Sequence, residues 1–384
     1  MALPVTGTPS PNAIEATFTQ RSYEPGQFAE LRVATPPGRF TARVYRAGYG
    51  REGVLDGMPV TGAIMLGSIS KTRIRVGSWP SGLYYLRLAT PNEHDGYAPF
   101  VVRPRRLGTH RIAVLLPTDT WQAYNFYDED GDGRPDSWYR NPGVSCVHLT
   151  RPFVDRGVPP HYTGYDRGFV RWLAETHKSV DFLTDDDLVR VSGSALARAY
   201  DLIVVSGHEE YVTPHAYDLV ERYRDSGGNL MFLSANNLFY RVERHGDSIC
   251  RTGRWRDLGR PEAGLLGIQY VDWYQERYRN RPYVVTGAEQ APWAFRGTGL
   301  QNGDRFGTYG IEIDARTSRS PHGIKVLARI VDVFGPGKSA EMTYYTTPRG
   351  AKVFAAGVIN FGGTARWPTV SPLLDNLWKE LSKP

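Results

Sequence analysis

The most chemically informative stretch of the chain is the segment 201–211, which reads Asp-Leu-Ile-Val-Val-Ser-Gly-His-Glu-Glu-Tyr. Its apolar residues predict a buried strand, and the glycine that follows predicts a tight turn presenting His208, Glu209 and Glu210. In an open α/β sheet, ligands bind at the carboxyl ends of the strands. A histidine and a carboxylate two residues apart, such as His208 and Glu210, could bind a metal ion and orient a water molecule.

Polar side chains also follow three other predicted strands, so four strand ends should converge on one rim of the sheet. These further loops are 118–125, 184–187 and 234–237. Taken alone, Thr184 and the three aspartates after it are better explained as the cap of a helix, because short oxygen-bearing side chains satisfy the first free N–H groups.

The predicted turn lacks a nucleophile. Class I glutamine amidotransferases and α/β-hydrolases place Cys or Ser on the equivalent strand-to-helix turn, whereas this chain has His208 and Glu209 there. A metal-free hydrolase would have to use Ser206 or Cys146, and neither lies in a G-x-S-x-G context or an equivalent turn. Covalent catalysis is therefore disfavoured, and a metal-activated water is the simpler hydrolytic route.

The first hundred residues have the pattern of short β-strands. Alternating stretches recur between Gly, Pro and Asn turns without a helical period, at 29–34, 40–45, 72–76, 82–88 and 98–103. This pattern predicts an immunoglobulin-like β-sandwich domain over residues 1–107, and 104–109 is expected to be a linker.

From His110 onward, apolar strands alternate with amphipathic helices. The expected strands are 111–117, 180–183, 202–206 and 229–234, with helices at 165–177 and 214–226 and later elements at 340–345, 352–359 and 373–381. Alternation of this kind predicts a parallel, doubly wound α/β sheet of the flavodoxin-like type over residues 108–384.

Composition restricts the partners and the compartment. The 384 residues include 46 basic and 40 acidic ones, a net charge of +6, and the basic residues are scattered, so nucleic acid is not an expected partner. The two cysteines are too few for a disulfide framework and wrongly spaced for structural zinc, which favours a reducing, cytoplasmic location. No stretch resembles a signal peptide or a membrane span, although a cleaved signal peptide would leave no trace.

Several motifs in one order resemble the large-subunit core of N,N-dimethylformamidase and its relatives. They are 120–125 (Thr-Trp-Gln-Ala-Tyr-Asn), 181–188, 206–211, 227–236 and 310–314 (Gly-Ile-Glu-Ile-Asp), and 42–50 and 79–84 resemble the β-domain that precedes that core. The resemblance implies a core like that of a class I glutamine amidotransferase without its nucleophile. It also implies a mononuclear ferric ion, Fe(3+), held by two tyrosines and one glutamate.

Carried over by motif, Tyr124 and Glu210 are the better supported iron ligands. Tyr165 is the favoured second tyrosine, and Tyr162 and Tyr127 compete with it. The resemblance further implies that His208, Asn236 and Glu312 are catalytic or lie beside the ligands, with Asn236 donating a hydrogen bond to the developing oxyanion. Phenolate and carboxylate oxygens suit a hard, highly charged ion, and three protein ligands leave positions for water and substrate.

A second metal signal lies at 128–136, which reads Asp-Glu-Asp-Gly-Asp-Gly-Arg-Pro-Asp. Calcium, Ca(2+), would be bound by the carboxylates of Asp128, Asp130, Asp132 and Asp136 and by the backbone carbonyl of Arg134. Gly133 should form the sharp turn, and Tyr139 replaces the bidentate Glu that closes an EF-hand loop. The loop follows Tyr124 closely and could order the rim that contains it.

The sequence thus predicts a metal-dependent hydrolase of a small formamide-like or other C–N substrate. The alternative is a non-catalytic carbohydrate- or ligand-binding protein, in which the β-sandwich binds and the α/β part is a scaffold. The substrate, a homo-oligomer and the need for a small partner subunit stay open, because fold and motif do not determine them.

Overall fold

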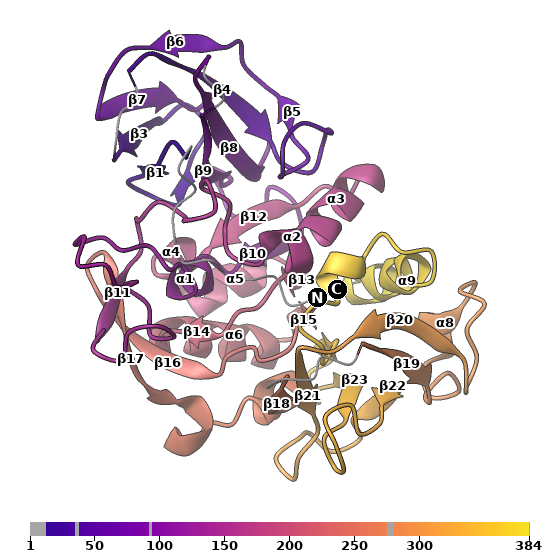
Figure 1. Cartoon of the computed structure of the whole chain (residues 1–384). Helices are drawn as coiled ribbons and strands as arrows, with labels where there is room; N and C mark the ends of the chain where they lie inside the picture. The colour runs from indigo at the N-terminus through magenta and orange to yellow at the C-terminus, as the bar shows by residue number, and fades with distance from the viewer. Residues whose placement is uncertain (1–12, 35–37, 92–93, 275–279, 384) are drawn as a thin grey trace.

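The computed structural model describes residues 13–34, 38–91, 94–274 and 280–383. The part up to Val102 consists of strands in two sheets (Figure 1). The smaller sheet has the order β1 (Ala16–Phe18), β3 (Phe28–Val33) and β7 (Lys71–Arg75). The larger has the order β2 (Ser22–Tyr23), β9 (Asp95–Val102), β8 (Gly82–Ala89), β4 (Phe40–Arg46) and β5 (Met58–Pro59), and β6 (Ile64–Leu66) also pairs with β4. Side chains from both sheets share one apolar cluster, so we call this part the sandwich.

Strand β8 is buried on both faces, which explains why its sequence is apolar almost throughout. Tyr84 and Leu86 point into the sandwich, whereas Leu83 and Tyr85 belong to an apolar cluster that continues into the rest of the molecule. At this contact the Ser81 hydroxyl accepts a hydrogen bond of 2.7 Å from the backbone N–H of Phe182. The sandwich therefore packs directly on β12 (Asp181–Thr184), the edge strand of a separate nine-stranded sheet. The expected domain boundary between residues 107 and 108 stays a prediction.

The part of the chain after the sandwich contains a nine-stranded sheet, and its first five strands in spatial order are parallel. In spatial order these five are β12 (Asp181–Thr184), β10 (Ile112–Leu116), β13 (Leu202–Val205), β15 (Asn229–Phe232) and β24 (Lys352–Ala355). Four antiparallel strands extend it: β23 (Ala340–Thr346), β22 (Lys325–Ile330), β19 (Arg281–Val285) and β20 (Arg305–Tyr309). The likeness to a class I glutamine amidotransferase stays a prediction.

Helices cover both faces of the parallel strands (Figure 1). One face packs against α3 (Arg167–Glu175) and α9 (Ser371–Leu381), and the other against α5 (Gly193–Ala199) and α6 (Pro214–Asp225). Helix α6 begins as its sequence predicts, because the Thr213 hydroxyl accepts from the backbone N–H of Ala216 and Pro214 occupies the first turn. Shorter helices are α1 (Thr118–Ala123), α2 (Tyr162–Tyr165), α4 (Asp185–Leu188), α7 (Ala263–Leu266) and α8 (Pro292–Phe295), with 3₁₀ turns η1 (Trp255–Leu258) and η2 (Gly362–Thr364).

Two small sheets complete the described part. The four-stranded one has the order β11 (Cys146–His148), β17 (Ser248–Arg254), β16 (Tyr240–His245) and β14 (Tyr211–Val212), and the two-stranded one pairs β18 (Gln269–Trp273) with β21 (Glu312–Ala315). Cys146 and Cys250 form a disulfide that links β11 to β17. The sequence did not predict this pairing, and it speaks against the expected reducing compartment, because structural disulfides persist in oxidising ones. The cytoplasmic location stays a prediction.

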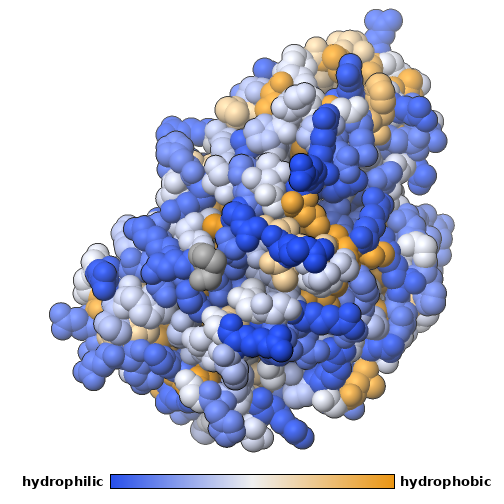
Figure 2. Space-filling model, turned by 180° about the vertical axis from the view of Figure 1, so that it is seen from behind, coloured by the Kyte–Doolittle hydropathy of each residue, from blue (hydrophilic) through white to orange (hydrophobic). Residues whose placement is uncertain are grey.

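The outer surface is mainly hydrophilic. Seen from behind, hydrophilic residues are spread over the whole face, and hydrophobic ones form separate patches over the sandwich and across the middle of the molecule (Figure 2). Within the described ranges, no helix combines the length and apolar character needed to cross a membrane.

Candidate active site

Residues from three strand ends and from β21 converge on one buried carboxylate, that of Glu210. Tyr124 ends α1, which follows β10, and Asn236 lies in the loop after β15. Glu210 itself lies in the loop between β13 and β14, and Glu312 opens β21. We call Tyr124, His208, Glu210, Asn236 and Glu312 the Glu210 cluster. The expected convergence of the loops after β10, β13 and β15 is therefore present in the structure.

The Glu210 carboxylate accepts three hydrogen bonds from side chains. Its Oε2 accepts from the hydroxyls of Tyr124 at 2.8 Å and of Tyr139 at 3.0 Å. Its Oε1 accepts from Nδ2 of Asn236 at 3.3 Å. Only 3 % of Glu210 is exposed, and burial raises its pKa, although these hydrogen bonds oppose the shift. A cation at this position would remove the cost of a buried negative charge.

Asn236 bridges two carboxyl groups. Its Nδ2 also donates to Oε2 of Glu312 at 2.8 Å. A primary amide has two N–H donors, and both are used by Glu210 and Glu312. In this arrangement both N–H groups of Asn236 are in use, and the expected oxyanion role stays a prediction. The free group of Asn236 is Oδ1, a buried acceptor without a hydrogen-bond partner.

His208 presents a second free acceptor. Its Nε2 is buried without a hydrogen-bond partner and lies 3.5 Å from Oε2 of Glu210 and 3.9 Å from Oε2 of Glu312. Burial, together with the nearby His161, lowers the pKa of His208 to about 3, while a hydrogen bond to the backbone of Asn236 acts in the opposite direction. The ring is therefore neutral at pH 7. Since the bond to the backbone leaves Nε2 without a partner, Nε2 carries the lone pair.

The Glu312 carboxyl shares the environment of Glu210. Burial raises its pKa first, and the charge of Glu210 raises it further. Burial and Glu210 also raise the pKa of Tyr124 well above its usual value. Without a cation, the cluster thus holds neutral phenols and carboxyl groups that take up protons more readily than usual.

A small pocket opens beside the cluster. Its walls are Thr120, Trp121, Tyr124, Pro160, His161, Tyr165, Asp166 and His208. The His161 ring stacks on Tyr165 with 5.1 Å between centroids and meets Tyr124 edge-on at 5.4 Å. The backbone of His161 is left-handed, with φ of 61°, a strained conformation that is often found at functional sites. Sequence reasoning did not identify His161.

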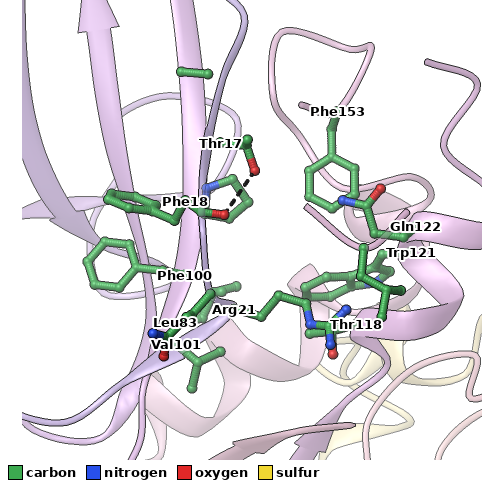
Figure 3. Close-up of a pocket in the computed structure, with 14 residues that line it drawn as sticks. Thr17, Phe18, Arg21, Leu83, Phe100, Val101, Thr118, Trp121, Gln122 and Phe153 are labelled. Carbon is green, nitrogen blue, oxygen red and sulfur yellow. Dashed lines mark hydrogen bonds between the residues drawn. The ribbon is translucent and has the colours of Figure 1, made fainter. Parts of the chain in front are cut away.

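A second cavity lies between the sandwich and α1 (Figure 3). Phe18, Leu83 and Phe100 form its wall on the sandwich side, and Trp121 and Phe153 face them. Most of its lining is apolar, and we call it the apolar cavity. Trp121 borders both this cavity and the pocket beside the Glu210 cluster.

Comparison with known proteins identifies the family. The family model described as N,N-dimethylformamidase beta subunit-like, C-terminal, matches residues 70–371. The chain belongs to this family. The N,N-dimethylformamidase beta subunit of Paracoccus aminophilus is 26% identical over 216 residues, which cover 43% of this chain and 27% of that protein. The beta subunit of an Alcaligenes species is 31% identical over 211 residues, covering 43% of this chain and 26% of that protein.

These alignments span about a quarter of the curated relatives' length. Among solved structures, the superoxide reductase (neelaredoxin) of Ignicoccus hospitalis aligns with 15% identity and a TM-score of 0.18, over 26% of this chain and 80% of that one. A likeness at that level carries no argument. Membership of the N,N-dimethylformamidase beta subunit-like family confirms the resemblance seen in the sequence motifs.

The competing tyrosines of this family member separate in space. Tyr165 lines the pocket together with Tyr124 and His208, as a second ligand would require. The Tyr127 hydroxyl instead donates to Oε2 of Glu15 at 3.2 Å, and Tyr162 packs edge-on against Trp121 and does not line the pocket. The geometry thus favours Tyr165 over Tyr127 and Tyr162, and the second tyrosine ligand stays a prediction.

Tyr139 is a residue that the sequence did not assign to the site. Its ring stacks on Tyr124 with 4.4 Å between centroids, and its hydroxyl contacts both Glu210 and Tyr211. The available signal was its place three residues after the acidic loop that ends at Asp136. The loop brings Tyr139 back over Tyr124, so it does border the rim that contains Tyr124.

The acidic loop keeps part of its expected geometry. Ligand oxygens of Asp128, Asp130 and Asp136 lie within 4.8 Å of one another, and Gly133 has φ of 84° at the turn. Asp132 is not part of that group, and its Oδ1 accepts from the backbone N–H of Arg134. Calcium binding by the five expected ligands stays a prediction.

The remaining candidates have other roles. Thr184 and Asp187 form a capping box at the start of α4, so the expected helix cap is confirmed. Glu209 is buried near Asp185 and Asp119, and its pKa is raised by burial first and by those carboxylates second. The Ser206 hydroxyl is buried and donates to Asp166, while Cys146 is in the disulfide. Neither side chain lines the pocket beside the Glu210 cluster, and the metal-free hypothesis stays a prediction.

The Glu210 cluster offers open valences beside acidic groups. They are lone pairs on Nε2 of His208 and Oδ1 of Asn236, and the buried carboxyl group of Glu210 and the half-buried one of Glu312 lie beside them. Buried polar atoms without partners cost free energy, and a cation bound by oxygen ligands would satisfy several at once. Phenol and carboxylate donors select a hard ion over a soft one.

Proposed function

We propose that this chain hydrolyses the C–N bond of a small linear amide with a water molecule activated at the Glu210 cluster. The observation that carries the proposal is the pair of free buried acceptors, Nε2 of His208 and Oδ1 of Asn236, beside two carboxyl groups and next to a small pocket. The relatives' name, N,N-dimethylformamidase, supports the reaction class.

Tyr124, Glu210 and a second phenol would hold a ferric ion. Tyr165 on the pocket wall and Tyr139 on Glu210 compete for the second position. When bound, such an ion supplies Lewis-acid polarisation of a carbonyl group and a lowered pKa for bound water. We further propose that the acidic loop binds a structural calcium ion through Asp128, Asp130 and Asp136.

The chain's own residues would handle the proton. Because Nε2 of neutral His208 has a free lone pair, it can accept a proton from the attacking water and return it to the leaving nitrogen. Oε2 of Glu312 lies 3.9 Å away, and its ionised form, which burial and Glu210 disfavour, would stabilise the imidazolium formed between these steps. Oδ1 of Asn236 would accept the second O–H of the water, which orients it. Trp121 and Tyr165 limit the size of the substrate and exclude bulk water.

The experiment is metal analysis and amide turnover on the same preparation. We expect near-stoichiometric iron, a tyrosinate charge-transfer band and hydrolysis within a panel of formamides and acetamides. Tyr124→Phe should lose the band, and Tyr200→Phe is the matched control, because the buried Tyr200 also donates to a carboxylate, Asp181, at 3.1 Å. Colourless protein that takes up no iron and hydrolyses no amide would refute the proposal in favour of the ligand-binding alternative.

We also propose that this chain acts within an assembly, either with a second kind of subunit or as a homo-oligomer. The relatives that support this are named as beta subunits, and the chain aligns with about a quarter of their length. Light scattering of the purified chain tests it: a monomer with full turnover would refute it.

A further inference from the structure

Strand β21 carries two acidic residues, the half-buried Glu312 and the buried Asp314, that point to the same side, because residues two apart on a strand share a face. Both contact Asn236. Glu312 accepts from its side-chain Nδ2. Asp314 accepts its backbone N–H with both carboxylate oxygens, at 2.9 and 3.0 Å. One strand therefore holds Asn236 by its side chain and by its main chain.

The main chain of Asn236 needs such a contact. Its φ is 52°, in the left-handed region that residues other than glycine seldom adopt. Leu238, two residues on, has φ of 56°, so this loop leaves β15 through two unfavourable conformations. Conformations of this kind persist only where surrounding contacts determine them.

Asp314 is itself rigidly placed. Only 1 % of it is exposed, and its backbone N–H donates to the carbonyl of Gly357 at 3.0 Å. The backbone N–H of Ile359 donates to the carbonyl of Glu312 at 3.2 Å, which secures the start of the same strand. A carboxylate fixed in this way can impose a conformation on its partner.

We propose that Asp314 is a positioning residue, which holds Asn236 in the left-handed conformation that places its amide between Glu210 and Glu312. The inference rests on the proposed function of the Glu210 cluster. Asp314 is only 1 % exposed and both of its carboxylate oxygens accept from Asn236, so it acts through Asn236 and not on the substrate. If the Asp314 contact is lost, the Asn236 amide leaves the two carboxylates.

The test compares Asp314→Asn with a matched control, Asp181→Asn. Asp181 is also fully buried on a strand and also accepts a backbone N–H, that of His110, but it lies away from the Glu210 cluster. In Asp314→Asn, one acceptor oxygen becomes an N–H₂ donor that faces the N–H of Asn236. We expect kcat for amide hydrolysis to fall about 10- to 100-fold with little change in KM, because misplaced catalytic groups cost rate more than binding. Asp181→Asn should keep kcat.

A second readout does not depend on turnover. Hydrogen exchange in the segment 233–239 should become roughly 10-fold faster in Asp314→Asn and stay unchanged in Asp181→Asn, since the N–H of Asn236 loses one of its two acceptor oxygens and faces a neutral amide in place of a carboxylate. Unchanged exchange would overturn the proposal. If the wild-type protein hydrolyses no amide, the proposed function fails, while this exchange measurement still decides the role of Asp314.

Glycine provides the rescue experiment, in case Asp314→Asn does not fold. Glycine adopts φ near +52° without strain, so in an Asn236→Gly background the substitution Asp314→Asn should fold and change exchange in 233–239 much less. An equal change in both backgrounds would show that Asp314 does not determine the conformation of residue 236, and would overturn the proposal.

Discussion

Two cavities border the side chain of Trp121, and their polar groups differ. In the apolar cavity, the Thr17 hydroxyl and the Gln122 amide each have a partner within the protein, and Nη1 of Arg21, which makes no hydrogen bond, lies 3.2 Å from the Asp119 carboxylate. In the pocket beside the Glu210 cluster, His208 has a buried acceptor without one, and neighbouring Asn236 has another. Satisfied groups stabilise the fold, whereas unsatisfied ones lower stability and persist where a ligand completes them. We therefore expect substitutions in the apolar cavity to change the stability of the fold, and substitutions in the Glu210 cluster to change catalysis.

The largest effect should come from removing the charge at the centre of the cluster. Glu210→Gln keeps the shape, but it replaces one acceptor oxygen with a donor facing Tyr124 or Asn236. We expect kcat/KM for amide hydrolysis to fall about 1,000-fold or more, about 4 kcal/mol, together with the bound iron. Steady-state kinetics and elemental analysis measure both losses. If this variant hydrolysed amides as fast as the wild type, the Glu210 cluster would not be the catalytic site.

On the other side of Trp121, a core substitution should cost stability and leave turnover intact. Phe100 lines the apolar cavity and meets Phe18 edge-on at 4.8 Å between ring centroids. Phe100→Ala should lower the free energy of unfolding by about 3 kcal/mol, because it enlarges a cavity in a packed core. Urea denaturation measures this loss, and kcat per folded molecule should match the wild type. A parallel fall in kcat would show that Trp121 couples the two cavities.

A smaller effect should identify the second phenol. Tyr165→Phe and Tyr139→Phe each remove one hydroxyl near Tyr124, and Tyr200→Phe again serves as the control. The variant that removes a ligand should weaken iron binding about 10- to 100-fold and shift the charge-transfer band, whereas loss of a neighbour should change affinity less. Iron titration followed by absorbance provides the measurement. If both variants bind iron like the control, neither phenol is a ligand.

Much of the α/β part could be predicted from local pattern. The strand expected at 202–206 is β13 (Leu202–Val205), and the helix expected at 214–226 is α6 (Pro214–Asp225). Both carry their own signals: an uninterrupted apolar run for a strand buried on two faces, and a threonine cap followed by proline for a helix. The expected strand 98–103 overlaps β9 (Asp95–Val102) up to Val102 for a similar reason.

The sequence pattern could not predict contacts between segments that are far apart in the chain. The hydroxyl of Tyr139 reaches Glu210 across 71 positions, and the disulfide spans 104. Neither contact leaves a local periodic signal in the sequence. Each depends on how the four-stranded sheet of β11, β17, β16 and β14 lies over the carboxyl ends of the parallel strands. The sequence also cannot show that Glu312 and Glu210 use both N–H groups of Asn236.

The smallest expected effect concerns a buried charge behind the apolar cavity. Nη1 of Arg21 lies 3.2 Å from Oδ1 of Asp119 and makes no hydrogen bond, so Arg21 and Asp119 interact by charge alone. The other two guanidinium nitrogens of Arg21 donate to Asp186. Burial raises the pKa of Asp119, and the charge of Asp185 raises it further, while Arg21 lowers it. Because the folded pKa lies above the unfolded one, the folded state binds the proton more tightly. The stabilisation is complete below about pH 4 and is lost as pH rises toward neutrality. Between pH 4.5 and pH 7.5, the free energy of unfolding should therefore fall less in Asp119→Asn than in the wild type, with a difference of about 1 kcal/mol. Urea denaturation at the two pH values measures this difference. An unchanged pH dependence would show that Asp119 is ionised throughout, and that Arg21 compensates its burial fully.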